Sequence, residues 1–302
     1  MTGLDYLSQQ HSKNVPKENL MKVYSVASFD EFQRHCELSA TAYSEHIQSL
    51  EDVLPADDRP FTLRGYSCSA EKEVDFYCDF NWGSGFPNMN WRERVVCPIT
   101  HLNNRMRAAL HVFELFSNVY DSDSIYIMEQ TTPMYSFLRN RYPNLIGSEY
   151  LGDVVPLGAL DDRGLRNEDA TRLTFSDNSL STILSFDVLE HIYDYKSALK
   201  ECLRALKPGG SFFFTAPFNP YSVENIERAV FDEQGQLKHL LAPEYHGNPL
   251  SSEGVLCFRH YGWSLLRELR QIGFAEAKAL VFFSSAMGYC TRQLIFHCRK
   301  AS

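Results

Sequence analysis

The sequence has no long apolar run and few cysteines, and each shortage excludes a class of protein. No stretch approaches the roughly 20 apolar residues that a membrane-spanning helix needs, and no basic segment followed by an apolar run stands near the start. Eight cysteines in 302 residues are too sparse for a secreted disulfide scaffold. We therefore expect a cytoplasmic protein without membrane attachment, whose cysteines are free thiols or metal ligands.

Basic residues are also fewer than acidic residues. Lys and Arg number 29 against 38 Asp and Glu, which gives a formal net charge of −9. Because binding to phosphate backbones needs clustered Lys and Arg, nucleic acid is not an expected partner. The 44% hydrophobic content is instead sufficient for a sizeable buried core.

Glycine is missing from a turn where nucleotide-binding α/β proteins usually have it. The stretch IYIMEQTTPMYSFL, residues 125–138, predicts a buried strand, a short turn and a helix. Glycine at such a turn lets the backbone come close to a ligand, but Thr131, Thr132 and Pro133 stand here instead. Whether this turn still serves a binding site is the main question that the sequence raises.

A polar cluster near residues 121–124 divides the chain into two expected domains. Residues 1–120 begin with a polar arm of about 22 residues, and one or two helices are expected at 28–54. A cysteine-containing module of short segments follows at 64–97, and a further helix at 103–116. Residues 121–302 alternate strands and helices, which predicts a parallel sheet covered on both faces. A long mixed segment at 219–260 is expected to be an insertion or lid over the strand ends.

The second domain gives the clearer element predictions. We expect strands at 125–128, 145–148, 181–186 and 211–218, a weaker one before Asp169, β-rich runs at 277–285 and 292–298, and helices at 134–142, 195–206 and 264–272. Pro208-Gly209-Gly210 is expected to stop the middle helix, and His260 to stand at a helix start. Acidic residues follow successive strands, at Glu129, Glu149, Asp169 and Asp187. In doubly wound sheets ligands lie beyond these strand ends, where acids can grip ribose hydroxyls or an adenine amino group; capping or solvent exposure is the alternative for each.

One continuous segment carries a specific resemblance. EDATRLTFSDNSLSTILSFDVLEHIYDYKSALKECLRALKPGGSFFFTAPF, residues 168–218, resembles the C-terminal half of the core of class I S-adenosylmethionine-dependent methyltransferases. The resemblance implies a doubly wound, mostly parallel seven-stranded Rossmann-like sheet and S-adenosylmethionine as cofactor. It places Glu149 on the cofactor ribose, Asp169 with Ala170 at the adenine, and Asp187 with His191 at the methionine end. The whole implied cofactor set is Glu129, Gln130, Thr131, Glu149, Tyr150, Asp169, Ala170, Asp187 and His191.

The turn after Glu129 departs from the family pattern. In register with that pattern, the family's glycines become Thr131, Pro133 and Tyr135. Three interpretations stay open: a displaced cofactor site that uses Glu129, Gln130 and threonine hydroxyls, a site for another ligand, or a domain without cofactor. EQTTPMY with GSEYLGD, and NWRERVVCP with LNNRMRA, resemble a bacterial subset linked to sugar or glycan modification, in which the glycine-poor turn is habitual. That resemblance favours the first interpretation.

The cysteine-containing module also resembles that subset, whose members usually have two Cys-x-x-Cys pairs. Each pair has one cysteine left here, because Glu71 and Thr100 take the other positions. Cys68, Cys78, Cys97 and His101 are therefore only weak candidates for a zinc site, and buried structural cysteines are the favoured interpretation. The nearby arginines 92, 94, 105 and 107 could form a small anion-binding surface, or more ordinarily a solvated helix face.

The stretch EYHGNP, residues 244–249, supplies the candidates for acid–base chemistry. A hydroxyl acceptor needs a base, for which His246 is the first candidate and His191 the second, with Asp187 or Glu244 as orienters. A surface-loop histidine is the alternative for His246. The leading hypothesis is O-methylation of a small molecule such as a sugar or secondary metabolite; the alternative is a catalytically silent binding or scaffold protein. A dehydrogenase is disfavoured because its glycine fingerprint is missing.

Overall fold

The computed structural model describes residues 21–117, 119, 123–248 and 250–302, which form two compact units. Among the described residues, unit 1 contains 21–26, 30–117 and 279–295, and unit 2 contains 27–29, 119, 123–248, 250–278 and 296–302. The predicted N-terminal arm falls mainly on residues 1–20, outside the described part. The predicted division at 120/121 runs close to the 118/119 boundary, but residues 279–295 group with unit 1.

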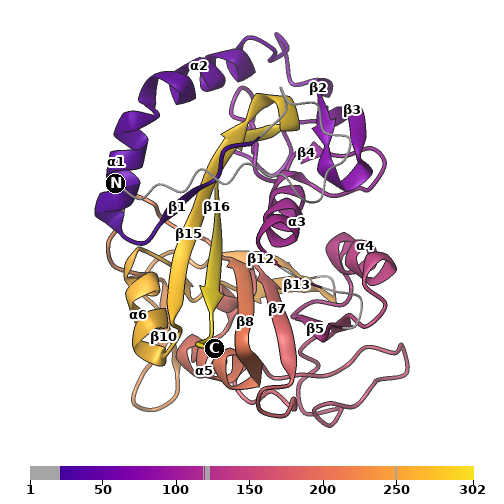
Figure 1. Cartoon of the computed structure of the whole chain (residues 1–302), viewed down its shortest axis with the longest axis vertical. Helices are drawn as coiled ribbons and strands as arrows, with labels where there is room; N and C mark the ends of the chain where they lie inside the picture. The colour runs from indigo at the N-terminus through magenta and orange to yellow at the C-terminus, as the bar shows by residue number, and fades with distance from the viewer. Residues whose placement is uncertain (1–20, 118, 120–122, 249) are drawn as a thin grey trace. The chain divides into compact units, whose positions relative to one another are not determined.

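A seven-stranded sheet confirms the predicted α/β class. Its hydrogen-bonded order is β1-β15-β16-β8-β7-β5-β6, and β6, β5, β7 and β8 pair in parallel, whereas β16 runs antiparallel to β8 (Figure 1). The strands are β1 (Tyr24–Val26), β5 (Ile125–Ile127), β6 (Ile146–Gly147), β7 (Leu180–Phe186), β8 (Leu206–Thr215), β15 (Glu276–Ser284) and β16 (Tyr289–Arg299). The accompanying elements of unit 2 are α4 (Pro133–Arg141), the 3-10 turn η3 (Leu189–His191), α5 (Tyr195–Ala205) and α6 (Ser264–Ile272).

The central strands form where apolar residues occupy both faces. In β8, Phe212, Phe213 and Phe214 are wholly buried, as in a strand covered on both sides. Ile183 and Leu184 of β7, which pair with Phe212 and Phe213, are equally buried. This rigid pair of strands fixes the position of the residues that follow β7.

Two local details of these elements differ from the prediction. Helix α5 ends at Ala205, before Pro208-Gly209-Gly210 as expected, but strand β8 begins already at Leu206, so the proline and glycines lie inside this strand. Gly209 has φ +74°, and the pairing register with β7 shifts here, so the segment is an irregular strand start of the kind that glycine permits. Before Asp169 the structure has an isolated bridge between Glu149 and Asn167 instead of a strand.

The segment at 219–260 consists of short two-stranded pieces. They are β9 (Ile226–Glu227) with β14 (Arg259–His260), β10 (Ala229–Phe231) with β11 (Leu237–His239), and β12 (Tyr245–Asn248) with β13 (Ser251–Leu256). His260 therefore lies in a strand, where it pairs with Ile226, and not at a helix start as expected, because the helix begins only at Ser264.

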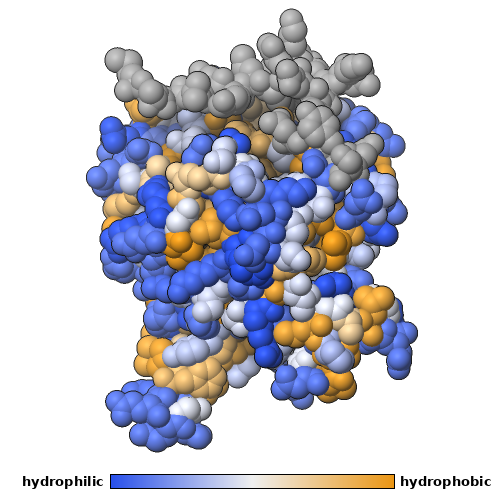
Figure 2. All heavy atoms as spheres, turned by 60° about the horizontal axis from the view of Figure 1, so that its bottom comes forward, coloured by the Kyte–Doolittle hydropathy of each residue, from blue (hydrophilic) through white to orange (hydrophobic). Residues whose placement is uncertain are grey.

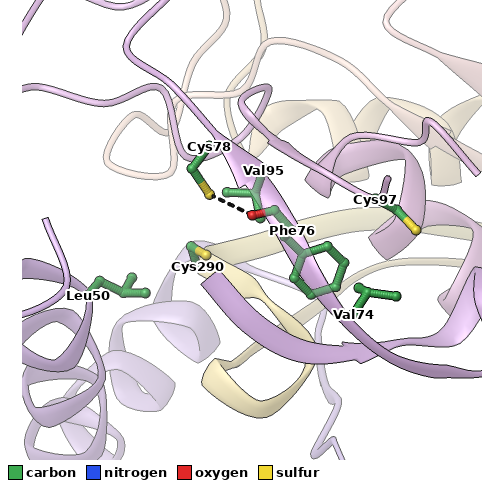
Figure 3. Packing of buried hydrophobic residues seen from close by; sticks show 7 residues of the cluster. All are labelled: Leu50, Val74, Phe76, Cys78, Val95, Cys97 and Cys290. Atoms are coloured by element: carbon green, nitrogen blue, oxygen red, sulfur yellow. Dashed lines mark hydrogen bonds between the residues drawn. The ribbon is translucent and has the colours of Figure 1, made fainter. Parts of the chain in front are cut away.

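Unit 1 confirms the expected elements of the N-terminal part. Two helices, α1 (Phe29–Leu38, almost all in this unit) and α2 (Ala40–Glu51), precede the antiparallel strands β2 (Phe61–Ser67), β3 (Lys72–Cys78) and β4 (Val95–Val96), and α3 (Asn104–Phe116) follows. The core of the module contains three cysteines among apolar side chains, as Figure 3 shows: Leu50, Val74, Phe76, Cys78, Val95, Cys97 and Cys290. All eight cysteines of the chain are free thiols.

The four arginines at 92, 94, 105 and 107 are engaged by partners within unit 1. Arg107 is wholly buried, donates hydrogen bonds to the carbonyls of Met287 (2.9 Å) and Gly288 (3.1 Å), and stacks on the ring of Phe76. Arg94 forms an ion pair with buried Asp79, while Arg92 and Arg105 pair with Glu93. Their charges serve the packing of the unit, because each is used by a partner within it.

None of the described helices could span a membrane. Within the described ranges every helix is too short or too polar to cross a bilayer. Hydrophilic and hydrophobic residues are intermixed over the face that Figure 2 shows.

Candidate functional site

The glycine-less turn after β5 holds a carboxylate in place. One oxygen of Glu149, Oε1, accepts hydrogen bonds from the backbone N–H groups of Gln130 (2.8 Å) and Thr131 (2.9 Å) and from the Thr131 hydroxyl (2.7 Å). Glu149 follows β6, whose strand is parallel to β5, so the turn and the acid meet at the same sheet edge. The turn therefore orients the acid that the sequence predicted on the cofactor ribose.

The side chain of Gln130 points its amide at the neighbouring loop. It donates to the carbonyl of Gly164 (2.9 Å) and accepts from the N–H of Arg166 (2.8 Å). In this arrangement Gln130 and Thr131 hold Glu149 and the 164–166 loop in place. Their predicted direct contacts with the cofactor remain a prediction.

The ring of Tyr135 packs against Gly147 beside the glycine-less turn. A Cβ atom placed on Gly147 would overlap the ring of Tyr135 and lie 2.8 Å from the carbonyl oxygen of Glu129. Only glycine on β6 leaves room for the tyrosine ring of α4. Glu129 itself is buried directly after β5. The space that a glycine opens is therefore filled by a side chain of the protein and not by a ligand.

The predicted adenine-side residues lie in the following loops. The ring of Tyr150 is 64% exposed and so is free to stack against a flat ligand. One oxygen of Asp169 accepts from the backbone N–H of Thr171 (2.9 Å) and its hydroxyl (2.7 Å), and the other from Arg172 (3.0 Å). Burial acts to raise the pKa of Asp169, but these donors outweigh it and lower the pKa. Asp169, with the partly buried Ala170 beside it, is thus an ionised acceptor in a fixed orientation.

Asp187 stands at the carboxyl end of β7 in an unusual conformation. Its φ of +56° is in the left-handed region, which Asp adopts more readily than most residues. The N–H of Asp187 donates to the carbonyl of Thr215 (3.0 Å), and the Thr215 hydroxyl donates to Oδ1 of Asp187 (2.7 Å). Such locally strained backbone concentrates at functional sites. Here β8 holds the Asp187 carboxylate at the strand ends.

Two histidines predicted from distant parts of the sequence lie together beyond β7. The rings of His191 and His246 are 4.9 Å apart, edge to face, and both border the carboxylate of Glu190. His191 comes from the 3-10 turn η3 and His246 from strand β12, so the 219–260 segment places a histidine beside the turn that follows β7; its role as a lid stays a prediction. The structure thus brings the two candidate bases into one site.

Glu244 joins this site from the side of His246. Its Oε1 lies 2.9 Å from Nε2 of His246 and 2.9 Å from Nε2 of His260, and its Oε2 lies 3.2 Å from Arg228. Burial acts to raise the pKa of Glu244, but the hydrogen bonds from His260 and His246 lower it to about 2. The carboxylate of Glu190 raises the pKa of His246 to about 9 against the opposing effect of burial, and Glu244 adds to this rise.

Sequence reasoning missed three residues of this site. Glu190 stands inside the quoted LEH motif, next to His191, and that adjacency was the available signal. His260 was assigned to a helix start, and Arg228 has no distinguishing motif around it. The contact of Glu190 with His246, and those of His260 and Arg228 with Glu244, depend on the tertiary fold, which no local pattern of the sequence reveals.

The four weak zinc candidates of unit 1 are not brought together into a site. Groupings that could hold a metal occur elsewhere in the described chain, at Glu190, His191 and His246 and at Glu244, Cys257 and His260. Cys68 instead contacts His111 (3.2 Å), Cys97 accepts from Ser67 (3.4 Å), and Cys78 lies in the core of the module.

Comparison with known proteins finds similarity in the central part of unit 2. Residues 134–214 match a family model described as a methyltransferase domain. A relative from Mycolicibacterium smegmatis, described as a "probable S-adenosylmethionine-dependent methyltransferase", is 34% identical over an alignment of 81 residues; the alignment covers 23% of this chain and 32% of the relative. The chain thus spans about a third of the length of that relative. The matched segment includes Glu149, Asp169, Asp187 and His191, the residues that the sequence resemblance placed around the cofactor.

Comparison with solved structures finds methyltransferases at low sequence identity. An S-adenosylmethionine-dependent methyltransferase from Mesorhizobium loti is 16% identical, with a TM-score of 0.41 over 67% of this chain and 100% of that chain. Phosphoethanolamine N-methyltransferase 2 from Haemonchus contortus, solved with S-adenosyl-L-methionine, is 13% identical, with a TM-score of 0.37 over 65% of this chain and 52% of that chain.

The residues at the strand ends fit the donor and acceptor pattern of S-adenosylmethionine. Three donors fix Oε1 of Glu149, so that Oε2 can accept from a diol. Tyr150 offers an exposed ring, and Asp169 is an oriented acceptor in the next loop. The N–H groups of Gln130 and Thr131 are committed to Glu149, so the methionine end depends on other residues, of which Asp187 and His191 are the predicted ones.

Proposed function

We propose that this chain transfers a methyl group from S-adenosylmethionine to an oxygen atom of a small molecule. The observation that carries the proposal is the fixed carboxylate of Glu149, which lies within the segment that matches a methyltransferase domain. Glu149 would accept from the ribose hydroxyls, Tyr150 and Asp169 would border the adenine, and Asp187 would lie near the methionine end. When bound, the cofactor supplies a methyl group on a positively charged sulfur and leaves as S-adenosylhomocysteine.

The two histidines give the proposal its acid–base chemistry. An acceptor hydroxyl must lose its proton as the new oxygen–carbon bond forms, so a base has to be within reach. Nδ1 of His191 lies 2.8 Å from the carbonyl of Leu256 and so carries a hydrogen, which leaves Nε2 as the proton acceptor. Glu190 beside this nitrogen would stabilise the imidazolium that results. Because the carboxylates of Glu190 and Glu244 raise the pKa of His246 to about 9, His246 is protonated at neutral pH, and we propose His191 as the base in its place.

A sugar or another polyhydroxylated metabolite suits the surroundings of this site as the acceptor. The residue before His246, Tyr245, has a ring that is 56% exposed, and aromatic rings commonly stack against the apolar faces of such molecules. The resemblance of EQTTPMY and GSEYLGD to a subset linked to sugar or glycan modification supports the same class of acceptor.

Calorimetric titration of the whole chain with S-adenosylmethionine and S-adenosylhomocysteine tests the cofactor. We expect saturable binding of one equivalent of each and no binding of NAD, which serves as the adenine-containing control. Absence of binding by both sulfur compounds would sink the proposal. The Asp169→Ala variant should bind both compounds more weakly, because it loses an oriented acceptor in the adenine loop.

A second candidate function is that of a catalytically silent binding protein. The commitment of the Gln130 and Thr131 N–H groups to Glu149 favours it, together with Pro133, which has no N–H to offer. Transfer of a labelled methyl group to a panel of hydroxylated acceptors discriminates the two functions. Turnover by the wild-type chain that the Asp169→Ala substitution abolishes would exclude the silent alternative.

A further inference from the structure

A buried carboxylate lies at the centre of the histidine site. Glu190 has no exposed surface, and within the described part of the chain neither of its carboxylate oxygens accepts a hydrogen bond. An ionised carboxylate in such surroundings is costly unless a positive charge compensates it. The energetics therefore call for a positive charge beside Glu190, which either a proton on His246 or a bound cation would supply.

Two imidazole nitrogens face the same oxygen of Glu190. Nδ1 of His246 lies 3.4 Å from Oε1 and Nε2 of His191 lies 3.7 Å from it. The three ligand atoms lie within 4.8 Å of one another. A tetrahedral ion with bonds of about 2.0 Å to nitrogen and oxygen separates its ligand atoms by about 3.3 Å, so the observed spacing needs only a small contraction.

The other nitrogen of each ring already has the partner that a metal-bound histidine requires. Nδ1 of His191 lies 2.8 Å from the carbonyl of Leu256, and Nε2 of His246 lies 2.9 Å from Oε1 of Glu244. These hydrogen bonds place a hydrogen on the outer nitrogen of each ring. Once an incoming ion displaces the second proton of His246, the lone pairs that remain are on the two nitrogens that face Glu190.

We propose that a divalent transition-metal ion binds between Glu190, His191 and His246. Two imidazoles and one carboxylate suit Zn²⁺, Fe²⁺ or Co²⁺ and leave at least one coordination position for another molecule. Glu244 supports the site from outside by orienting His246, and is itself held by His260 and Arg228. No cysteine of unit 1 takes part.

The neighbouring group of Glu244, Cys257 and His260 is a weaker candidate for the ion. Both carboxylate oxygens of Glu244 are occupied, one by the two histidines and the other by Arg228. The thiol of Cys257 donates to the carbonyl of Arg259, and burial raises its pKa to about 12, so it stays protonated. An ion there would have to displace these partners, whereas an ion beside Glu190 would give its carboxylate a partner.

The use of the ion, but not its binding, rests on the proposed function. A hydroxyl oxygen of the acceptor bound at the open position would release its proton to water more readily than a free hydroxyl. In that state His191 is a ligand, and the ion takes over the role of lowering the pKa of the hydroxyl. Methyl transfer would then depend on the ion.

Titration of the chelator-treated whole chain with Co²⁺ and Zn²⁺, without cofactor, tests the site. We expect one equivalent of Co²⁺ with a visible spectrum of nitrogen and oxygen ligands and without thiolate charge-transfer bands. Glu190→Gln and His246→Asn should each weaken binding at least tenfold, and Glu244→Gln about tenfold through its effect on His246. His239→Asn removes an exposed histidine of strand β11 and should bind like wild type.

Several outcomes would overturn the inference. These are no bound ion in the wild-type chain, thiolate bands in the Co²⁺ spectrum, or wild-type affinity in both Glu190→Gln and His246→Asn. If Glu190→Gln fails to fold, His246→Asn decides, because His246 is partly exposed. Cofactor binding without ion binding would refute this inference alone, whereas ion binding without cofactor binding would refute the proposed function alone.

Discussion

Replacement of Glu149 tests both the architecture of the turn and its proposed use. Its Oε1 accepts three hydrogen bonds from Gln130 and Thr131. A hydrogen bond to a charged group contributes about 1.5–3 kcal/mol, but Thr131 is exposed and Glu149 only partly buried, so water replaces much of each. At about 1 kcal/mol each, Glu149→Ala should lower the free energy of unfolding by about 3 kcal/mol. Glu149→Gln keeps an acceptor oxygen and should cost about 1 kcal/mol.

The two Glu149 variants should differ in stability but not in their affinity for the cofactor. Loss of charged hydrogen bonds to the ribose should weaken S-adenosylmethionine binding by about 10- to 100-fold in both variants, because neither retains the carboxylate. Urea unfolding followed by circular dichroism gives the stability, and calorimetry gives the affinity. Asp153→Asn, at an exposed carboxylate in the same loop, is the matched control for lost charge. Glu149 variants that unfold and bind like this control would refute the reasoning.

Three further predictions concern other contacts. Thr131→Val removes one donor to Glu149 and should weaken cofactor binding several-fold, whereas Thr131→Ser should bind like wild type in the same titration. Arg107→Met leaves buried carbonyls without a donor and should lower the free energy of unfolding by about 3–5 kcal/mol in urea; a change below about 1 kcal/mol would contradict the assigned role. Arg94 lowers the pKa of Asp79, so their ion pair stabilises unit 1 above pH about 4 and is lost as pH falls through the lowered value. In the Asp79→Asn variant the free energy of unfolding should therefore depend less on pH between about pH 5 and about pH 2 than in the wild type. An unchanged pH dependence would count against the assigned ion pair.

Much of the fold could be predicted because local signals and the global fold agree. Strand β7, helix α6 and the two helices at 28–54 follow directly from apolar periodicity and turn residues. The irregular start of β8 could not be predicted, because Pro208-Gly209-Gly210 is the ordinary signal for a helix end. Only the pairing of this segment with β7 makes it a strand, and pairing is not a local property of the sequence.

The candidate site divides in the same way. The acids that follow strands were recognisable, since the ends of parallel strands meet at one edge. The contact of His246 with Glu190 spans 56 positions of the sequence and depends on how the 219–260 segment folds back. Likewise, Arg107 looked solvated because helical spacing gives a face but not its surroundings. Burial of a charge is decided by tertiary partners, which a single sequence does not display.

The contact between Tyr135 and Gly147 has a consequence for recognising related sites in other chains. The two positions are coupled: glycine at 135 would leave the space above β6 empty, while any larger residue at 147 would displace the tyrosine. A larger residue at 147 therefore requires a smaller side chain at 135. A search that requires glycines in the turn itself overlooks them, whereas a search for a bulky residue in the turn helix paired with a glycine on the next strand would find them.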